Sequence, residues 1–456
     1  MKGNPKKFFT FCKSKKCDSQ GVAPLKKNGL VHSDSRTKAN ILNHQFASVF
    51  TKENLQNLPQ LDPNKYQKMP DITIDQCGVL KLLQQLNPHK ASGPDIISTK
   101  LLKELATEIC PALTLLFQAC VSQGLIPAAW KIAHVTPIFK KGDRSKASNY
   151  RPVSLTSVTC KVLEHILHSN IITHFEQHNI LTDAQYGFRK KQSCESQLIR
   201  TVDDLAKSLD DNEQVDAVLL DLSKAFDKVP QQRLLLKMDH YGVQGGALNL
   251  IGDFLNQRTP KVLVNGEQSE TCPVTSGVPQ GTVLGPLLFL AYINDMPECV
   301  TSTCRLFADD SLVYRRIKTP ADAFLLQQDL KELEAWELLW QMSFNPDKCE
   351  VLRITNKRNP IVTNYIIHGK ELATVKSAKY LGVTITSKLS WNNHVSNISK
   401  KANSTLAFLQ RNTTRCPRHV KAMCYNTFIR PSLEYSSAVW SPYTNNNIEC
   451  LEKVQR

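Results

Sequence analysis

The spacing of apolar side chains predicts three amphipathic helices in the N-terminal half of the chain. Apolar positions recur every three to four residues over 79–86, 102–117 and 161–175, which is the period of one helix face. Pro111 lies inside the second stretch. We expect it to bend that helix, because proline cannot donate the backbone hydrogen bond of a helix interior.

Shorter apolar runs further along the chain predict strands. Two of these runs cover residues 215–220 and 262–264, and short runs rich in β-branched residues favour strands. Residues 304–307 and 312–314 form another pair of runs with only four residues between them. This pair therefore predicts a tight β-hairpin.

A long helix is predicted directly after that hairpin. Thr319 fits its N-cap, Pro320 fits its first turn, and Asp322 lies where a capping box places an acid. Apolar residues then continue at helical spacing as far as Trp336 and Trp340. We expect both tryptophans in the core rather than as platforms for base stacking.

Three carboxylates lie at the ends of the predicted strands. Asp309 and Asp310 occupy the tip of the hairpin, and Asp221 ends the strand predicted over 215–220. An isolated Asp-Asp pair is more often a solvated turn. Two neighbouring strands that end in carboxylates can instead hold two divalent cations roughly 3.5–4 Å apart, the geometry of in-line phosphoryl transfer.

The basic charge of the chain is concentrated at its two ends. The net charge is +16, and residues 1–52 contribute +9 while residues 396–456 contribute +6. A single run of charge is often only a solvated face. In a chain with candidate phosphoryl-transfer carboxylates, nucleic acid is the better explanation of the charge.

The cysteines and the hydropathy predict a reduced, intracellular protein, either nuclear or cytoplasmic. The pairs Cys12/Cys17 and Cys299/Cys304 lack further ligands at zinc-site spacing. The apolar run over 283–293 is too short to cross a bilayer. No signal peptide is expected, since no apolar core follows the basic N-terminus.

Three blocks of sequence resemble motifs A, B and C of the reverse transcriptases of non-LTR (LINE-class, jockey-like) retrotransposons. They are Asp-Leu-Ser-Lys-Ala-Phe-Asp at 221–227, Ser-Gly-Val-Pro-Gln-Gly-Thr-Val-Leu-Gly-Pro at 276–286 and Phe-Ala-Asp-Asp at 307–310. The resemblance extends over roughly residues 75–456. Further matching blocks lie at 90–95, 139–143, 149–155, 186–189, 345–348 and 380–383.

The resemblance implies an α+β fold of the right-hand polymerase type. Fingers are expected over 75–210 and a palm with an antiparallel split-βαβ sheet over 211–390. A helical thumb is expected over 391–456, truncated at its end. Residues 1–74 are expected to be a basic, partly disordered linker, interrupted by one helix-like patch at 39–50.

The implied activity is that of an RNA-directed DNA polymerase. Asp221, Asp309 and Asp310 are the expected catalytic residues and the expected ligands of two Mg²⁺ ions, which prefer carboxylate oxygens. The expected partners are an RNA template, a DNA primer or target and dNTPs, with no membrane. The endonuclease that nicks the target is expected on another polypeptide or to be missing.

Six further residues are candidates for binding the dNTP. Phe226 would exclude a 2′-hydroxyl, although from the residues alone it reads as a core phenylalanine. Lys348 is a candidate general acid for the leaving pyrophosphate, although a surface lysine in such a turn is unremarkable. The others are Gln280, Arg151 and one of Lys140 and Lys141, between which the sequence does not choose.

Two rival readings remain open. The chain could be a truncated remnant that binds nucleic acid without useful turnover. It could also be another right-hand polymerase of the maturase or telomerase type, against which the wording of residues 276–286 argues. Asp227 is interpreted as structural, in a turn or a helix cap.

Overall fold

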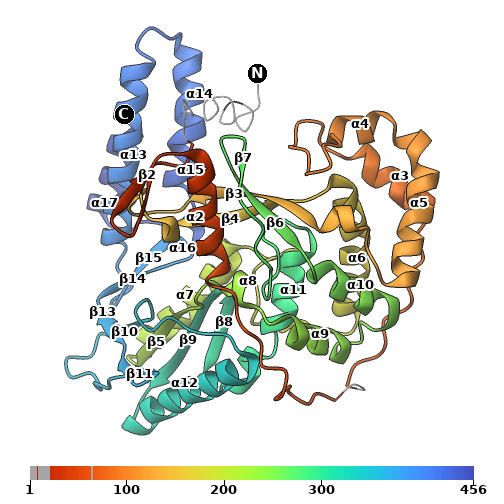
Figure 1. Cartoon of the computed structure of the whole chain (residues 1–456). Helices are drawn as coiled ribbons and strands as arrows, with labels where there is room; N and C mark the ends of the chain where they lie inside the picture. Colours follow the sequence, from red (N-terminus) through yellow and green to blue (C-terminus); the bar gives the residue numbers. More distant parts are fainter. Residues whose placement is uncertain (1–7, 9–20, 63–64, 456) are drawn as a thin grey trace.

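Two larger β-sheets, three two-stranded sheets and the helices packed around them make up the described part of the structure (Figure 1). This computed structural model describes residue 8, residues 21–62 and residues 65–455. The combination of helices and sheets confirms a mixed α and β fold.

The central sheet has five strands in the order β13-β10-β5-β9-β8. Its middle strand, β5 (Gln214–Asp221), runs antiparallel to both β9 (Asp310–Ile317) and β10 (Glu350–Ile354). β8 (Thr303–Phe307) forms the predicted hairpin with β9, and β13 (Ala373–Val375) pairs in parallel with β10. The predictions of a strand over 215–220 and of the hairpin are therefore confirmed.

β5 is buried on both faces, which explains its nearly continuous apolar sequence. Val218 and Leu220 pack into the larger hydrophobic core, whereas Val215 and Ala217 pack into a second core on the other face. α7 (Cys194–Asp210) contributes Leu198 and Leu205 to that second core. Each face of the sheet is therefore covered by apolar side chains.

The helix predicted after the hairpin is α12 (Pro320–Trp340). The side chains of Thr319 and Asp322 form the expected capping box, in which Asp322 Oδ2 accepts from the Thr319 N–H at 2.8 Å. Trp336 is 3% exposed and Trp340 is 2% exposed. Both tryptophans are core residues, as predicted.

Four helices lie between β5 and β8 along the chain and pack into the larger core. The last of them is apolar at almost every position and buried along its whole length, because it lies in the middle of that core. They are α8 (Ala225–Lys228), α9 (Gln231–His240), α10 (Gly245–Leu255) and α11 (Leu284–Ile293).

The second sheet has the strand order β4-β3-β6-β7. β3 (Ile132–Phe139) pairs antiparallel with β4 (Tyr150–Leu155) and parallel with β6 (Thr259–Val264). β7 (Glu267–Gln268) forms a short hairpin with β6. The strand predicted over 262–264 is the second half of β6.

The three helices predicted in the N-terminal half are present, but the second is divided in two at Leu105. Pro111 lies within the second piece, and it does not end the helix there. Because proline has no N–H, the carbonyl four residues before it lacks its helical partner. The side chain of Pro111 is exposed, so that carbonyl can bind water. These helices are α3 (Gln76–Gln84), α4 (Thr99–Glu104), α5 (Ala106–Gln123) and α6 (Val158–Gln177).

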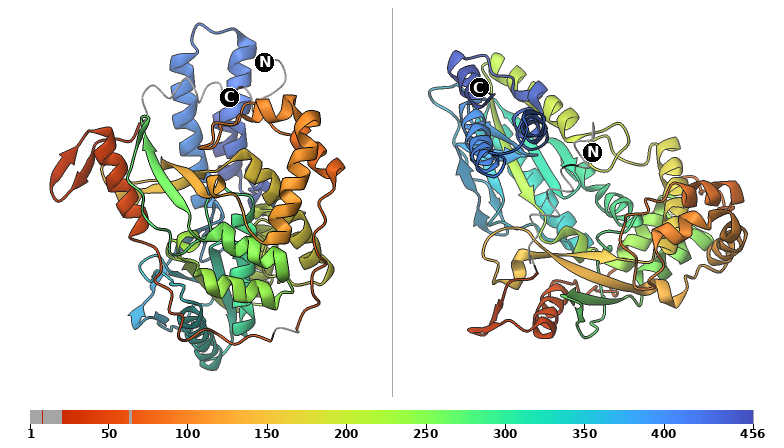
Figure 2. Two further views of the ribbon diagram at one scale, coloured as in Figure 1. Left: turned by 45° about the vertical axis from the view of Figure 1, so that its right-hand side comes forward. Right: turned by 90° about the horizontal axis from the view of Figure 1, so that it is seen from above.

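The described part of residues 1–74 differs from the linker that the sequence predicts. β1 (Leu25–Lys27) and β2 (Leu30–His32) form a hairpin, and α2 (Ser35–Ala47) follows it beside β6 (Figure 2). Leu25 and Leu42 are fully buried against the second sheet. Apolar positions on one face of α2 explain this packing. Residues 48–62 and 65–74 contain no helix or strand, whereas residues 1–7, 9–20 and 63–64, with Cys12 and Cys17, lie outside the described residues.

The C-terminal helices pack around a small core of their own, which includes Ala402, Ile429 and Leu433. They are α13 (Asn392–Asn412), α14 (Arg418–Phe428), α15 (Arg430–Leu433), α16 (Ser437–Trp440) and α17 (Asn445–Gln455). The short elements that remain are β11 (Ile366–Ile367), β12 (Lys370–Glu371), β14 (Ser377–Tyr380), β15 (Val383–Thr386), η1 (Ala128–Lys131), η2 (Ala147–Asn149) and η3 (Met296–Cys299).

None of the described helices combines the length and the apolar content that a bilayer crossing requires. Within the same ranges, no disulfide joins any of the cysteines.

A buried histidine connects the C-terminal helices to β15. His394 is 2% exposed, its Nδ1 accepts from the Thr384 N–H at 3.2 Å, and its ring meets Trp440 edge-on at 4.7 Å. Burial lowers the pKa of His394 to about 4, and the positive charge of Lys379 acts in the same direction. The ring is therefore neutral in the folded chain.

We predict that this contact destabilises the fold on acidification. The unfolded histidine takes up a proton near pH 6.5, but the folded one does so only near pH 4, so stability is lost as the pH falls through this window. His394→Asn should reduce this pH dependence. Urea unfolding of both proteins across the window measures it, and equal slopes would contradict the prediction.

Candidate active site

The pairing of β5 with β9 brings the three predicted carboxylates to one place. Asp221, the last residue of β5, lies opposite Asp310, the first residue of β9. Asp309 lies in the turn just before β9, next to Ala308, whose φ is +53°. The structure therefore brings together the three residues that the sequence singles out as catalytic.

The turn that carries Asp309 is held by a segment from elsewhere in the chain. Gln185 is 2% exposed, and its Oε1 accepts from the N–H groups of Gly187 at 2.8 Å and Ala308 at 2.9 Å. A Cβ on Gly187 would lie 2.5 Å from the Ala308 nitrogen. The backbone of Leu306 also bonds to Ala184 and Tyr186.

Sequence reasoning missed Gln185. The available signal was its position directly before the Tyr-Gly-Phe-Arg block at 186–189. That block predicts a motif but gives no indication of a contact with residue 308, since the contact joins residues 123 positions apart.

Asp310 has a raised proton affinity beside the other two carboxylates. The pKa of Asp310 is raised to about 6, first by burial and then by the negative charges of Asp309 and Asp221, whereas Lys140 acts in the opposite direction. Lys348 Nζ lies 2.7 Å from Asp221 Oδ2. The site thus combines three carboxylates with the positive charges of Lys348 and Lys140.

Lys140 is the finger-block lysine that interacts with these carboxylates. The pKa of Lys140 is lowered overall, first by partial burial and then by the positive charges of Arg151 and Lys348. The negative charges of Asp221 and Asp309 oppose that shift. Lys140 follows β3 directly, and Arg151 lies on the adjacent strand β4. Lys140 and its neighbour Lys141 are both solvent-exposed, so the electrostatic interaction with the carboxylates, and not burial, distinguishes Lys140.

Phe226 is held by two other aromatic side chains. Its ring stacks on Phe289 of α11 with centroids 4.4 Å apart and an interplanar angle of 18°. The ring of Phe188 meets it edge-on at 6.5 Å. Phe226 remains only half-buried, so its ring has a fixed orientation and an exposed part.

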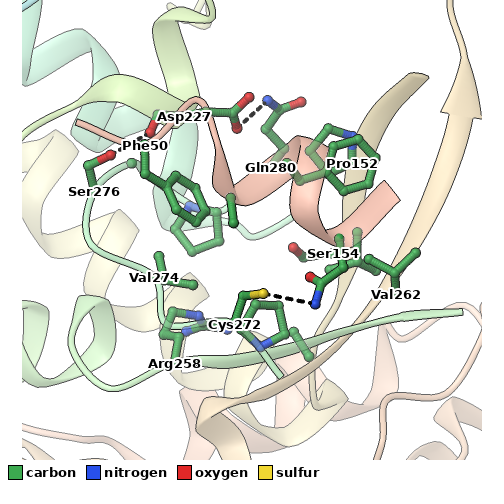
Figure 3. A pocket seen from close by; sticks show the side chains of 18 of the residues that line it. Phe50, Pro152, Ser154, Asp227, Arg258, Val262, Cys272, Val274, Ser276 and Gln280 are labelled. Atoms are coloured by element: carbon green, nitrogen blue, oxygen red, sulfur yellow. Dashed lines mark hydrogen bonds between the residues drawn. The ribbon is translucent and has the colours of Figure 1, made fainter. Parts of the chain in front are cut away.

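Gln280 is engaged by Asp227 (Figure 3). Its Nε2 donates to Asp227 Oδ1 at 2.9 Å, and its carbonyl accepts from the Ser154 N–H at 2.8 Å. Burial raises the pKa of Asp227, and the bond from Gln280 opposes that shift. The next residue, Gly281, has a φ of +100° and no room for a Cβ beside the Ser154 carbonyl.

The donor set suits a hard divalent cation. Carboxylate oxygens are the ligands that Mg²⁺ prefers, and the negative charges of Asp309 and Asp221 contribute, after burial, to the raised pKa of Asp310. Within the described ranges, however, no group of three or more acidic, histidine or cysteine side chains is placed so that it could hold a metal ion. The metal ligands therefore stay a prediction.

The three carboxylates thus lie where the antiparallel strands β5, β8 and β9 end, with Lys348 bonded to Asp221. The model of the reverse transcriptase (RNA-dependent DNA polymerase) family matches residues 138–385, more than half of the chain. The chain belongs to the reverse transcriptase family.

Relatives refine this assignment. The chain is 29% identical over 416 residues to the probable RNA-directed DNA polymerase from transposon X-element of Drosophila melanogaster, covering 89% of this chain and 45% of the relative. It is 27% identical to the polymerases from mobile element jockey of Drosophila melanogaster, covering 84% of the chain and 43% of the relative, and of Drosophila funebris, covering 93% and 47%.

The chain thus spans about half the length of the curated relatives it matches. These likenesses confirm the predicted resemblance to the reverse transcriptases of non-LTR, LINE-type retrotransposons.

We predict that Gln185 fixes the turn of the β8–β9 hairpin. Gln185→Met keeps the volume but removes the acceptor of two buried N–H groups, which should lower the free energy of unfolding by about 1–3 kcal/mol. Amide hydrogen exchange at Ala308 should become faster. The exposed Gln84 of α3 provides the control Gln84→Met, and unchanged exchange at Ala308 in Gln185→Met would contradict the assignment.

Proposed function

We propose that this chain is the RNA-directed DNA polymerase core of a non-LTR retrotransposon. It would transfer a nucleotide from a dNTP to a primer 3′-hydroxyl on an RNA template. The observation that carries the proposal is the Asp221–Asp310 pair with Asp309 beside it, flanked by Lys140 and Lys348, within the region that the family model matches.

The arrangement of the elements supports a right-hand polymerase. We assign the central sheet to a palm over 211–390, and the second sheet with α3–α6 to fingers over 75–210 together with β6 and β7. The C-terminal helices, over 391–456, would be the thumb. Figure 1 shows the C-terminal helices at the upper left of the molecule and α3–α5 at the upper right, with the central sheet below.

Asp221, Asp309 and Asp310 would hold two Mg²⁺ ions. When bound, such ions activate the attacking hydroxyl and neutralise the charge that develops on the leaving group. The protein's own contribution is to position the reacting groups and to supply positive charge. Lys348 now bonds to Asp221, and it would turn to the leaving pyrophosphate as its general acid.

The nucleotide would lie between the carboxylates and the second sheet. Arg151 can donate two parallel hydrogen bonds to phosphate oxygens, whereas Lys140 acts as a point charge. We favour Lys140 over Lys141, because Lys140 interacts electrostatically with Asp221 and Asp309.

Phe226 would discriminate against ribonucleotides, because its ring, stacked on Phe289, cannot move away from a 2′-hydroxyl. Gln280, whose side chain is bonded to Asp227, would line the nucleotide site through the backbone of its turn. In this proposal the RNA template and the DNA primer are held by phosphate contacts with the basic surfaces of the chain.

Primer extension on poly(rA)·oligo(dT) with dTTP and Mg²⁺ tests the proposal. The parent should extend the primer, and Asp309→Asn/Asp310→Asn should abolish extension, because the substitutions remove two negative charges from the site while preserving its shape. Binding of the RNA–DNA duplex should stay within a few-fold of the parent.

Failure of the parent to extend, with the duplex still bound, would contradict the proposal. That result would favour the rival reading of a remnant that binds nucleic acid without turnover. Equal loss of binding and extension in the variant would instead show that the two carboxylates serve the fold.

A further inference from the structure

Residues 50–57 cross from the end of α2 to the helices below the central sheet, and we call this segment the strap. It lies outside residues 138–385, which the family model matches. We propose that the strap positions the 276–281 loop and residues 227–228, the turn after Phe226 at the end of α8, and thereby determines which nucleotide is selected. This inference rests on the proposed polymerase function.

Thr51 joins the strap to both parts of the site. Its N–H donates to Ser276 Oγ at 2.7 Å, and its Oγ1 donates to the Lys228 carbonyl at 2.8 Å. Ser276 is 1% exposed, and its hydroxyl donates in turn to the Asp227 carbonyl at 2.8 Å. One strap residue therefore holds the first residue of the loop and the end of the turn after Phe226.

Further hydrogen bonds link the 276–281 loop to the residues proposed to bind the nucleotide. The Val278 N–H donates to the carbonyl of Phe226 at 2.8 Å, and Gln280 donates to the Asp227 carboxylate at 2.9 Å. Gly277, with φ +92°, lies so close that a Cβ would come within 2.7 Å of the Asp227 carbonyl. A shift of the loop would therefore move the backbone that carries Phe226.

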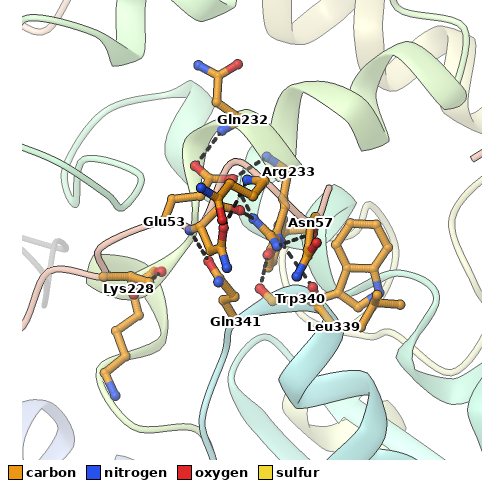
Figure 4. Close-up of polar contacts among 12 residues, drawn as sticks. Glu53, Asn57, Lys228, Gln232, Arg233, Leu339, Trp340 and Gln341 are labelled. Carbon is orange, nitrogen blue, oxygen red and sulfur yellow. Dashed lines mark hydrogen bonds and ion pairs between the residues drawn. The ribbon is translucent and has the colours of Figure 1, made fainter. Parts of the chain in front are cut away.

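The strap is anchored by a buried ion pair between Glu53 and Arg233 (Figure 4). The Glu53 carboxylate accepts from the N–H groups of Gln232 at 3.0 Å and Arg233 at 2.9 Å, at the N-terminal turn of α9, where a negative charge is favourable. Arg233 NH1 lies 3.2 Å from Glu53, and the two side chains are 3% and 8% exposed.

The guanidinium of Arg233 also binds the strap's backbone. It donates to the carbonyls of Asn54 at 2.9 Å and Asn57 at 2.8 Å, and its Nε donates to the Leu339 carbonyl of α12 at 3.0 Å. Since a buried charge is costly unless it is paired and hydrogen-bonded, these contacts fix the strap's position against α9 and α12.

A cavity of about 80 Å³ borders the same loop (Figure 3). Its wall includes Ser276 to Gln280 on one side, and on another Phe46 of α2 and Phe50, the first residue of the strap. This space is wide enough to hold water, so close packing does not restrain the loop on this side. The loop therefore depends on its hydrogen bonds, among them those from Thr51, to keep its place.

Hydrogen exchange tests the coupling without requiring activity. Thr51→Val keeps the shape and removes the hydroxyl donor to Lys228, and Glu53→Gln weakens the anchor. Amides of Gly277 and Val278 should exchange about threefold to tenfold faster in both variants, the change expected from one hydrogen bond. The exposed strap residue Gln56 supplies the control Gln56→Ala. Exchange equal to the control's would overturn the proposal.

Kinetics test the consequence for the substrate. Relative to the parent and to Gln56→Ala, Thr51→Val should raise the KM for dTTP and lower the preference for dTTP over rUTP, each about threefold to tenfold. The affinity for the primer–template should change less than twofold. A lower kcat with unchanged KM and unchanged sugar preference would mean that the strap serves only the fold, and would overturn the proposal.

The two readouts separate this inference from the proposed function. An inactive parent whose Thr51→Val variant shows faster exchange at Gly277 and Val278 would contradict the polymerase and leave the coupling standing. An active parent whose variants match the control in amide exchange and in the preference for dTTP over rUTP would contradict only the proposed role of the strap.

Discussion

Asp221 faces Asp310 because β5 and β9 pair in one particular register, and the charge of the site depends on that register. A slip by one residue would send each side chain of β9 to the opposite face of the sheet. Leu312 now packs into one core and Val313 into the other, so both faces of the strand resist a slip. The hydrophobic cores therefore determine where three mutually repelling carboxylates meet.

Residues from distant parts of the chain hold the carboxylates in place and offset their negative charge. Gln185 holds the turn before Asp309, Lys348 and Lys140 offset the negative charge, and the strap ties the 276–281 loop to α9. Several of these contacts join residues more than a hundred positions apart. The scaffold of the site therefore extends beyond the two strands that carry the carboxylates, and it includes residues N-terminal to the family's matched region.

Local sequence patterns predicted the features that depend on neighbouring residues. Apolar spacing and turn chemistry predict the hairpin with Asp309 at its tip and the strand before Asp221. They also predict the capping box of α12. The family resemblance then supplied roles for the charged residues. The preference for Lys140 over Lys141 needed the fold, because only the structure shows that Lys140 interacts with the carboxylates.

The features that the sequence did not predict depend on long-range packing. α2 reads as a patch in a basic linker until Leu42 is seen buried against β6. The pair of Glu53 with Arg233 spans 180 positions and has no local signature. The break at Leu105 was likewise not predicted, since the apolar spacing continues across it.

Direct metal binding tests the central claim that the β5–β9 register builds a divalent-cation site. Mn²⁺ can be titrated, with paramagnetic resonance as the readout, into the parent bound to an RNA–DNA primer–template and dTTP, and into Asp221→Asn under the same conditions. The account predicts about two bound ions per chain in the parent and a loss of binding in the variant. Equal Mn²⁺ binding by the parent and Asp221→Asn would contradict it.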